Sequence, residues 1–349
     1  MSRVIVHIID NMFLGGAQSM LQELYYAIEK YHPEYEQKVY ALRNLNNQDK
    51  ISMYSIPYSH ATMEKVIKKI KKDKQKTVVF FHKLSATRTE LYNPIVKSKL
   101  CPVFAINHTF LERLSRNRFE PCDVIISVSS HMCSHLGKSN PKANHQYIHN
   151  GVNGYRYENI IPIKKDRGDI FLTGRVNRIC QIKHSNDWLL WCSRVDIGKK
   201  MRHEYIGGGR QYQHACSYSK KITKKNRNDV KMLGEINDFD HKVSIMKNWD
   251  VFLYEVNACE GVSMAILEAM ALGVPVICSN HRGNIEIIKK GVNGYIFKNR
   301  TEAQQILTDL VHNKNKLKEL KQSTLEYFKE NLDAKFMAQK YIKLVEKYK

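Results

Sequence analysis

The chain has 349 residues, of which 43% are hydrophobic and 10% aromatic, and this suits two globular domains rather than a disordered chain. Its 56 Lys and Arg outnumber 34 Asp and Glu, and the formal net charge of +22 favours a polyanionic partner such as an anionic lipid surface or a phosphate-rich acceptor. Nucleic acid is disfavoured, because no zinc-finger spacing or aromatic-basic recognition motif accompanies the charge. No apolar run approaches the roughly 20 residues of a membrane-spanning helix, and the apolar stretch Val4–Ile9 is too short for a signal peptide. We therefore expect a cytoplasmic protein.

Short apolar runs alternate with helical patterns in the first half of the chain, which predicts a parallel sheet covered by helices. The expected strands are Val4–Ile9, Lys38–Leu42, Thr77–Phe81, Val103–Ile106, Asp123–Val128 and Gln146–Ile148, and a helix is expected over Gln18–Glu29. A further short helix is rich in lysine: Lys65, Lys68, Lys69, Lys71, Lys72, Lys74 and Lys76. The turn-rich stretch Asn150–Asn153 marks the end of this pattern.

The same alternation starts again near residue 170. The expected strands are Ile170–Thr173, His203–Ile206, Asp229–Met232, Asp250–Tyr254, Val274–Cys278 and Tyr295–Phe297. The expected helices are Ser185–Ser193, His241–Lys247, Met264–Leu272 and Asn284–Lys289, followed by a helical stretch over 301–349. A second basic cluster contains Lys220, Lys221, Lys224, Lys225 and Arg227.

These patterns predict an α/β fold with two Rossmann-like domains that face each other across a cleft. We expect the first domain over residues 1–160 and the second over 161–330. The helix over 331–349 is expected to pack back on the first domain. Ligands of open α/β sheets bind at the carboxyl ends of the strands, so the site is expected there.

One segment, residues 250–297, carries the clearest chemical signal. A buried strand ends at Tyr254, a loop carries Glu260, and the next helix is stopped by Gly273. The unpaired amides at the start of that helix suit a diphosphate, and they belong to Val262, Ser263, Met264 and Ala265. Glu260 precedes the helix and Glu268 lies in its second turn, and carboxylates at these places can accept hydrogen bonds from sugar and ribose hydroxyls.

This segment resembles the signature of glycosyltransferase family 4, the retaining enzymes of GT-B architecture among the glycosyl transferases group 1. The two glutamates are separated by seven residues, and a Gly-Val-Pro-Val-Ile strand and a later Asn-Gly follow them, as in the family. The resemblance implies that Glu260 contacts the donor sugar near the reacting carbon and that Glu268 binds the nucleotide ribose. It also implies that the first domain is the acceptor side and the second binds the nucleotide sugar.

Segments of the first half follow the family in order. Gly15 and Gly16 come after the first strand, like the Gly-Gly loop at which the family's backbone approaches donor phosphates and acceptor. His108 follows the strand Val103–Ile106, where family members carry a histidine that hydrogen-bonds the transferred sugar. His82 ends the preceding strand and is the competing choice for that contact.

Segments of the second half resemble the family's donor site. Gly174 and Arg175 follow the strand Ile170–Thr173, like the family's phosphate-gripping Gly-Arg. Two cations opposite the diphosphate suit a leaving group that gains charge. Lys183 is the best-placed second cation, and Arg178 could substitute for it. The last elements of this resemblance are the glycine turn that begins with Gly207 and the base-contacting strand end at Leu233 and Gly234.

The sequence contains no pattern that requires a cofactor or a metal. Asp238 and Asp240 form a D-x-D, but they lie just ahead of a helix, where aspartate caps amides. The glycine turn is not G-x-G-x-x-G, which disfavours a nicotinamide cofactor. The eight cysteines are scattered without a C-x-x-C pair, as expected of reduced thiols. The paired cations are expected to replace a metal ion.

The resemblance implies a retaining, metal-independent glycosyltransferase that moves a hexose or N-acetylhexosamine from a nucleoside diphosphate sugar, with a UDP-sugar favoured. The acceptor is expected to be a glycan hydroxyl, and the lysine-rich helix favours an anionic lipid-linked or phosphate-bearing glycan of a cell-surface polysaccharide pathway. The enzyme would then lie on the cytoplasmic membrane face as a peripheral protein. The alternatives are another GT-B enzyme, such as a sugar-nucleotide epimerase or a phosphorylase, and a non-catalytic nucleotide-sugar-binding subunit.

Overall fold

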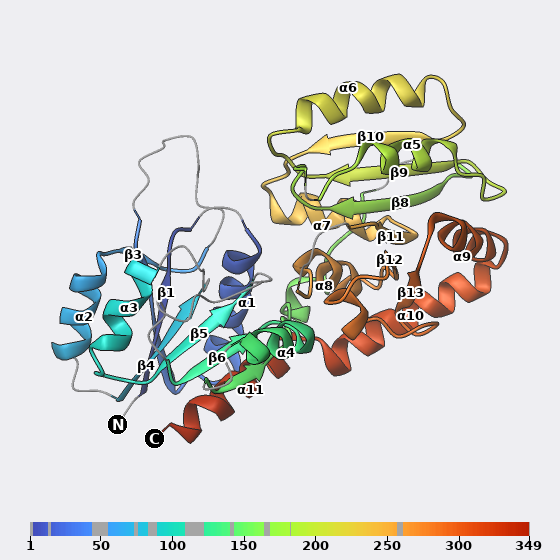
Figure 1. Cartoon of the computed structure of the whole chain (residues 1–349). Coiled ribbons are helices and arrows are strands. Elements are labelled where there is room, and N and C mark those ends of the chain that lie inside the picture. The colour runs from blue at the N-terminus through green and yellow to red at the C-terminus, as the bar shows by residue number, and fades with distance from the viewer. Residues whose placement is uncertain are drawn as a thin grey trace. The chain divides into compact units, whose positions relative to one another are not determined.

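The computed structural model describes residues 3–12, 15–43, 55–72, 76–82, 89–108, 122–139, 143–163, 168–181, 183–256 and 261–348, without the side chains of 89–92. The chain forms two compact units (Figure 1). The first contains Met1–Asn153, Glu260–Met264 and Leu332–Lys349, and the second contains Gly154–Cys259 and Ala265–Asn331. The final helix, α11 (Ala334–Lys347), therefore belongs to the first unit.

The first unit contains an all-parallel sheet in the order β3-β2-β1-β4-β5-β6-β7. Its strands are β1 (Arg3–Ile9), β2 (Tyr35–Ala41), β3 (Ser59–His60), β4 (Lys76–His82), β5 (Val103–Asn107), β6 (Val124–Ser127) and β7 (His145–Tyr147). The order reverses direction between β1 and β4, and ligands of such sheets bind outside the carboxyl ends of the strands at that point.

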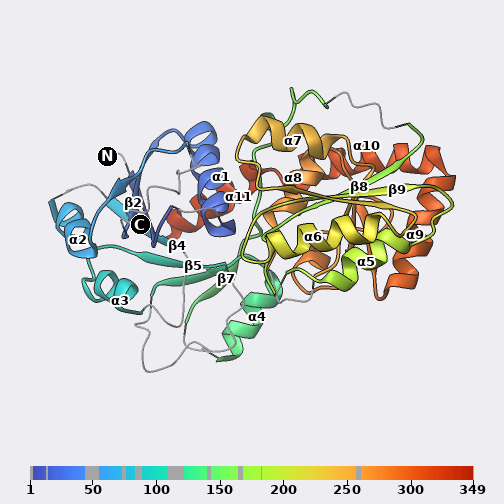
Figure 2. The ribbon, with the colours of Figure 1, turned by 90° about the horizontal axis from the view of Figure 1, so that it is seen from above.

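Two helix layers cover the two faces of this sheet. The helices are α1 (Gly16–Tyr31), α2 (Met63–Lys72), α3 (Thr89–Lys97) and α4 (Ser130–Ser139), together with α11. On one face, Val6 and Val79 pack with Val66 of α2 and Ile95 of α3. On the other face, α1 lies beside α11, and Phe80 of β4 meets Tyr341 of α11 with ring centroids 5.3 Å apart (Figure 2).

The second unit repeats this plan with an all-parallel sheet in the order β10-β9-β8-β11-β12-β13. Its strands are β8 (Phe171–Val176), β9 (Met201–Ile206), β10 (Asp229–Gly234), β11 (Val251–Tyr254), β12 (Val276–Ser279) and β13 (Gly294–Phe297). Its helices are α5 (Asn186–Arg194), α6 (Tyr212–Thr223), α7 (Phe239–Lys247), α8 (Met264–Ala271), α9 (Arg300–His312) and α10 (Lys314–Asn331). Figures 1 and 2 show α5 and α6 on one face of the sheet and α7 and α8 on the other. The two parallel α/β sheets confirm the expected fold class.

Several elements differ from the sequence expectation. The lysine-rich helix is shorter, because α2 ends at Lys72 and Lys76 already begins β4; Lys74 lies outside the described residues. The expected helix over Asn284–Lys289 is only a 3-10 turn, Asn284–Glu286. The side chain of Asn293 accepts from the amide of Lys289 at 2.7 Å and donates to the carbonyl of Ile287 at 2.9 Å. It thereby occupies backbone groups that a longer helix would have paired internally.

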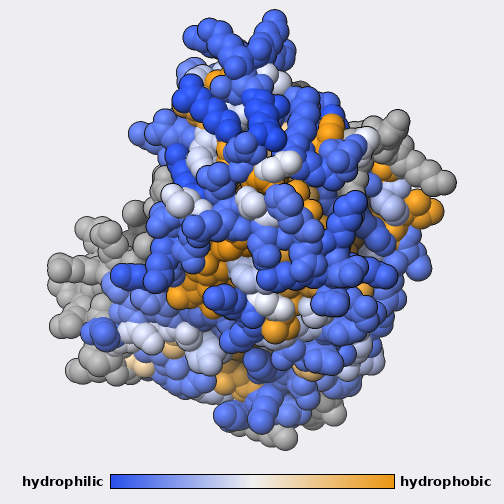
Figure 3. All heavy atoms as spheres, turned by 90° about the vertical axis from the view of Figure 1, so that its right-hand side faces the viewer, coloured by the Kyte–Doolittle hydropathy of each residue, from blue (hydrophilic) through white to orange (hydrophobic). Residues whose placement is uncertain are grey.

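The face in Figure 3 is covered mainly by hydrophilic side chains, with small, separate hydrophobic areas. Within the described residues, no helix combines the length and the apolar character that crossing a membrane would require.

Candidate functional site

The carboxyl edge of the second sheet, where its parallel strands end, is built from closely packed backbone. The amide of Gly207, directly after β9, donates to the carbonyl of Gly234 at the end of β10 at 2.7 Å. Gly207 has a φ of +148°, and a Cβ added there would overlap the carbonyl oxygen of Asn177, just after β8. Only glycine allows three strand ends to approach this closely. Gly207 and Gly234 thus lie next to each other, and backbone atoms rather than side chains form this part of the sheet edge.

Arg175 lies in β8 at the point where the strand order of the second sheet reverses. Its side chain is 1% exposed, and its guanidinium carbon lies 4.7 Å from the ring centroid of Tyr205 and 4.9 Å from that of Tyr254. Its Nη2 donates to the carbonyl oxygen of Lys183 at 3.0 Å, and its Nε is buried without a hydrogen-bond partner. Among the residues that the structure describes, no carboxylate pairs with this cation. Arg175 is therefore a buried positive charge that no acidic side chain of the described residues neutralises.

The adjacent Gly174 has a packing role that sequence reasoning missed. A Cβ added there would overlap the indole ring of Trp249, which is fully buried. The Nε1 of Trp249 donates to the carboxylate of Glu204 at 3.0 Å. This glycine is thus required by core packing, whatever ligand Arg175 contacts. The sequence held no signal for it, because Gly174 and Trp249 are far apart along the chain.

The two other candidate cations differ in exposure. Lys183 is half-buried, and its carbonyl accepts from both Arg175 and the side-chain amide of Asn177. Arg178 is exposed. The phosphate-binding role of Lys183 stays a prediction. The structure adds that its backbone is held directly against Arg175.

The end of β10 carries the predicted base-contacting residues. Leu233 is half-buried, and the strand register shifts between Met232 and Gly234. A Cβ added at Gly208 would meet the side chain of Glu235, so the glycine turn after β9 and the segment after β10 lie against each other. The structure therefore brings Gly207, Leu233 and Gly234 to one edge, as the resemblance implies.

The start of α8 holds the predicted anion site. The helix begins at Met264, Val262 and Met264 are buried, and Ser263 is half-buried. The side-chain amide of Asn150 donates to the carbonyl of Val262 at 3.1 Å and fixes the approach to the helix. Glu260, the predicted sugar-contacting residue, lies outside the described residues, so its role stays a prediction.

Glu268 of α8 forms an ion pair that sequence reasoning missed. Its Oε2 lies 2.9 Å from the Nζ of Lys242 in α7, and the two side chains are 13% and 18% exposed. Lys242 Nζ also lies 5.7 Å from the ring centroid of Phe239. This pairing orients one carboxylate oxygen of Glu268, while no hydrogen bond of Oε1 is recorded with any described residue. The ribose-binding role of Glu268 stays a prediction.

The first sheet carries the remaining candidates at its own carboxyl edge. Gly15 precedes α1 in extended backbone, and its carbonyl accepts from the amide of Ser19 at 3.0 Å. A Cβ added at Gly16 would meet no heavy atom within 4 Å. Packing among the described residues thus does not require glycine at position 16, and the predicted approach of a ligand there stays a prediction.

His108 follows β5 and stacks on His82, the last residue of β4, with ring centroids 5.8 Å apart and ring planes at 17°. His82 is fully buried, whereas His108 is half-buried. His82 also meets His7 of β1, which sequence reasoning missed, with a nitrogen–nitrogen distance of 3.1 Å. Burial lowers the pKa of His7 to about 4, and burial followed by its two histidine neighbours lowers the pKa of His82 well below its usual value. Both rings are therefore neutral near pH 7.

The D-x-D segment behaves as predicted. The side chain of Asp238 accepts from the amide of His241 at 2.6 Å and caps α7, so the capping interpretation is confirmed. The described part of the chain contains no cluster of three or more His, Cys, Asp or Glu side chains suited to a metal ion.

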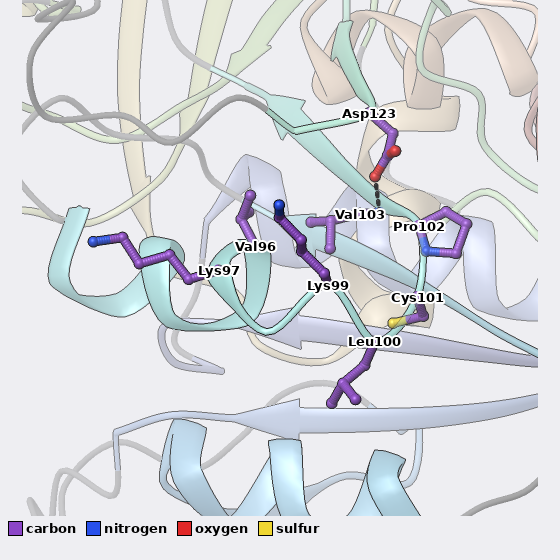
Figure 4. A pocket seen from close by; sticks show the side chains of 8 residues that line it. All are labelled: Val96, Lys97, Lys99, Leu100, Cys101, Pro102, Val103 and Asp123. Atoms are coloured by element: carbon purple, nitrogen blue, oxygen red, sulfur yellow. Dashed lines mark hydrogen bonds between the residues drawn. The ribbon is translucent and has the colours of Figure 1, made fainter.

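A hollow of about 720 Å³ lies at the opposite, amino edge of the first sheet (Figure 4). Its lining includes Lys97, Lys99 and Cys101, and the carboxylate of Asp123 is occupied by the amide of Val103 at 2.8 Å. Strands β5 and β6 begin here and end at the edge that carries His108. Because ligands of such sheets bind at the carboxyl ends of the strands, we do not assign the donor site to this hollow.

Sequence comparison finds a family match within the second unit. Residues 205–326, about a third of the chain, match the model of the family described as glycosyl transferases group 1. The chain is 25% identical over 156 residues to an uncharacterized glycosyltransferase, MJ1069, of Methanocaldococcus jannaschii. That segment is 44% of this chain and 40% of the relative, so less than half of each is compared.

Structural comparison covers nearly the whole chain. Anabaena Alr3699/HepE in complex with UDP-glucose aligns with a TM-score of 0.75 and 17% identity, over 98% of this chain and 99% of that one. A glycosyltransferase from Rickettsia africae aligns with a TM-score of 0.77 and 12% identity, over 100% and 99%. Similarity at these identities establishes the fold, and the fold is GT-B. The family match and the fold together support a glycosyltransferase of group 1 type.

Proposed function

We propose that this protein is a retaining glycosyltransferase that takes a hexose or N-acetylhexosamine from a UDP-sugar. The observation that carries the proposal is the carboxyl edge of the second sheet, where Gly207 is hydrogen-bonded to Gly234 and the buried Arg175 lies against Tyr205, two residues before Gly207. The group 1 match covers most of this unit, and a structure of the same fold, Anabaena Alr3699/HepE, binds UDP-glucose. The geometry of this edge, the family match and the fold thus all favour a UDP-sugar as the donor.

The donor diphosphate would be held by positive groups. The amides of Val262, Ser263 and Met264, at the start of α8, would donate to the diphosphate. Arg175 would donate to a phosphate oxygen in place of the Lys183 carbonyl that it holds in this structure, and the Lys183 ammonium would add a second charge. Glu268, oriented by Lys242, would accept from the ribose hydroxyls.

The sugar would be bound from the first unit and from the loop before α8. His108 would hydrogen-bond a hydroxyl of the transferred sugar, and Glu260 would contact the sugar near the reacting carbon. The bond to the diphosphate breaks through an oxocarbenium-like state, the acceptor hydroxyl enters on the same face, and the leaving phosphate oxygen takes its proton. The cations neutralise the leaving group, so no metal ion is required.

An anionic acceptor or membrane surface would be attracted by α2. Five lysines of this helix are exposed, and none of them pairs with an acidic side chain in the described part of the chain: Lys65, Lys68, Lys69, Lys71 and Lys72. Each basic residue near an anionic bilayer contributes about 1 kcal/mol. We therefore propose a peripheral protein of the cytoplasmic membrane face that glycosylates a lipid-linked or phosphate-bearing glycan.

The donor proposal is tested with UDP and UDP-glucose by isothermal titration calorimetry on the wild type and on Glu268→Ala. The expected result is UDP binding that weakens about tenfold in the variant, since one hydrogen bond to a charged group contributes about 1.5–3 kcal/mol. Glu330→Ala, an exposed glutamate of α10, is the matched control and should bind normally. Equal binding by all three proteins would refute the assignment of Glu268.

The reaction class is tested by NMR of the products formed from an α-linked UDP-sugar and an acceptor mixture, with and without EDTA. Retention predicts an α-linked product at an undiminished rate in EDTA. A β-linked product would refute retention, and loss of activity in EDTA would refute metal independence. An epimerised UDP-sugar would instead identify an epimerase, and sugar 1-phosphate released from a glycan after addition of inorganic phosphate would identify a phosphorylase. UDP binding without any product would indicate a non-catalytic subunit.

A further inference from the structure

A line of polar side chains crosses one face of the first sheet. Its members come from four neighbouring strands or their ends: Gln37 of β2, His7 of β1, His82 of β4 and His108 after β5. They share a face because His7 is paired with Val39 and Phe80, Gln37 is two residues before Val39, and His82 is two residues after Phe80. The remainder of this face is apolar and packs against α1 and α11.

The hydrogen bonds along this line have a single possible direction. The amide nitrogen Nε2 of Gln37 lies 3.0 Å from the carbonyl oxygen of Tyr25, which can only accept. The Gln37 oxygen Oε1 must therefore face His7, at 3.1 Å from its Nε2. Because that oxygen can also only accept, Nε2 of His7 carries a proton.

The same constraint passes on to His82. His7 is fully buried and neutral, so with a proton on Nε2 its Nδ1 is a bare acceptor. The Nε2 of His82, 3.1 Å away, must therefore donate to it. His82 is also neutral, which leaves its own Nδ1 without a proton. This nitrogen is buried and has no hydrogen-bond partner among the residues that the structure describes.

A buried acceptor without a donor is destabilising, and such groups are rare in folded proteins. An apolar side chain at position 82 would avoid that cost. The ring does, however, present a flat and uncharged face to His108, with the two planes inclined by only 17°. The nearly parallel contact with His108 is the feature that singles out His82, because His184 and His203 also have a buried ring nitrogen without a partner among the described residues.

We propose that His7 and His82 are positioning residues, and that the one-way hydrogen-bond chain beginning at the Tyr25 carbonyl holds His82 as the neutral Nε2–H tautomer on which His108 is stacked in its ligand-binding orientation. The proposal rests on the proposed function only for what His108 binds. It also assigns different roles to the two candidate histidines, because the half-buried His108 contacts the sugar and the fully buried His82 supports it.

The chain itself is tested by NMR on histidine-labelled, ligand-free, full-length protein, with the 15 histidines assigned by single substitutions. His7 and His82 should both give the signature of the neutral Nε2–H tautomer. In Gln37→Glu, the new carboxylate should stabilise His7 in its protonated form, with the second proton taken from solvent. His7 Nδ1–H would then donate to Nε2 of His82, so His82 should switch to the Nδ1–H tautomer and the His108 ring signals should shift. Gln37 is half-buried, so the variant should fold. If His7 became protonated and the His82 and His108 signals did not change, the proposal would be overturned.

The positioning role is tested with UDP-glucose as the probe, by measuring the hydrolysis rate and, separately, UDP affinity. Gln37→Glu and His82→Phe should lower kcat for UDP-glucose about 10- to 100-fold, with UDP affinity unchanged. His82→Phe keeps an aromatic ring and loses the hydrogen-bond donor, whereas His82→Gln keeps a donor and loses the ring. Comparing the two variants therefore distinguishes the contribution of the hydrogen-bond chain from that of the ring contact with His108. Full kcat in Gln37→Glu would overturn the positioning role. If the wild type failed to bind UDP, the proposed function would fall, and the tautomer measurement would still test the hydrogen-bond chain.

Discussion

Replacing Arg175 with Met separates a ligand-binding role from a structural one. Met has a similar length and no charge, so it can fill the space between Tyr205 and Tyr254 without a buried cation. The substitution removes a hydrogen bond to the Lys183 carbonyl and the two ring contacts of the guanidinium. It also removes the buried Nε that has no partner.

These changes largely offset one another in the absence of ligand. The lost hydrogen bond of a charged group contributes about 1.5–3 kcal/mol, and each ring contact about 0.5–2 kcal/mol. Relief of the unpartnered donor returns about 1–3 kcal/mol, and the apolar Met side chain packs well against the rings. We expect the free energy of unfolding to fall by only about 2 kcal/mol, which lowers Tm by about 4–8 °C for a unit of this size.

The stabilisation that UDP gives should fall by a larger fraction than the stability of the ligand-free protein does. UDP at 100 times its wild-type Kd raises the stability of the wild type by about 2.7 kcal/mol. If Arg175 binds a phosphate oxygen, the variant should bind UDP about 10- to 100-fold more weakly. At the same UDP concentration a 100-fold loss leaves a gain of about 0.4 kcal/mol.

The assay is a thermal unfolding series with and without UDP, followed by tryptophan fluorescence. All three tryptophans, Trp188, Trp191 and Trp249, lie in the second unit, so the signal reports on the unit that contains Arg175. Arg194→Met, which removes an exposed arginine of α5, is the control and should keep the full UDP effect. An Arg175→Met protein that keeps the full UDP effect would refute the phosphate-binding role and leave Arg175 a structural residue.

Three further predictions concern stability and membrane contact. Burial and the nearby Arg175 lower the pKa of His203 to about 3, so the unfolded chain binds a proton below pH 6.5 that the folded unit does not. The free energy of unfolding, measured in urea by tryptophan fluorescence, should therefore fall by up to about 1.4 kcal/mol per pH unit between pH 6.5 and pH 3. His203→Gln should flatten that slope. Gly207→Ala should cost more than about 3 kcal/mol in the same assay, because the added methyl group overlaps the Asn177 carbonyl, and a cost below 1 kcal/mol would contradict the packing described. Charge reversal at Lys68 and Lys72 together should weaken low-salt binding to phosphatidylserine vesicles by several kcal/mol, whereas the same reversal at two lysines of the second basic cluster, Lys220 and Lys221, should leave it unchanged; equal losses would remove the assignment to α2.

The fold was predictable because its signals are local and repeated. Runs such as Val4–Ile9 and Thr77–Phe81 are too apolar and too short to be anything but buried strands, and the helix from Met264 ends at a glycine where the spacing predicts it. The helix α6 was not predicted, because its buried side is built largely from small residues such as Ala215 and Ser219 and leaves little apolar periodicity.

The candidate site was predictable only in part, because some of its residues follow strand ends and others meet only through contacts between distant elements. Gly207 and Gly234 follow strand ends, and strand ends can be placed from the sequence. Lys242 as the partner of Glu268 could not be found, because two helices that follow different strands meet only after the sheet has formed. The histidine line had a faint signal: His82 ends β4, and His7 and His108 lie near the ends of their own strands.

Because α11 belongs to the first unit, the order in which the two units can finish folding differs from their order along the chain. Phe80 and the helix α1 remain partly uncovered until residues 334–347 arrive, although they are made within the first quarter of the chain. Residues 1–153 of the first unit are translated early, but the unit can be completed only after the segments 260–264 and 332–349 have left the ribosome. The second unit has all of its residues by Asn331, so the half that carries the candidate nucleotide site can become a finished body before the half that precedes it in the chain.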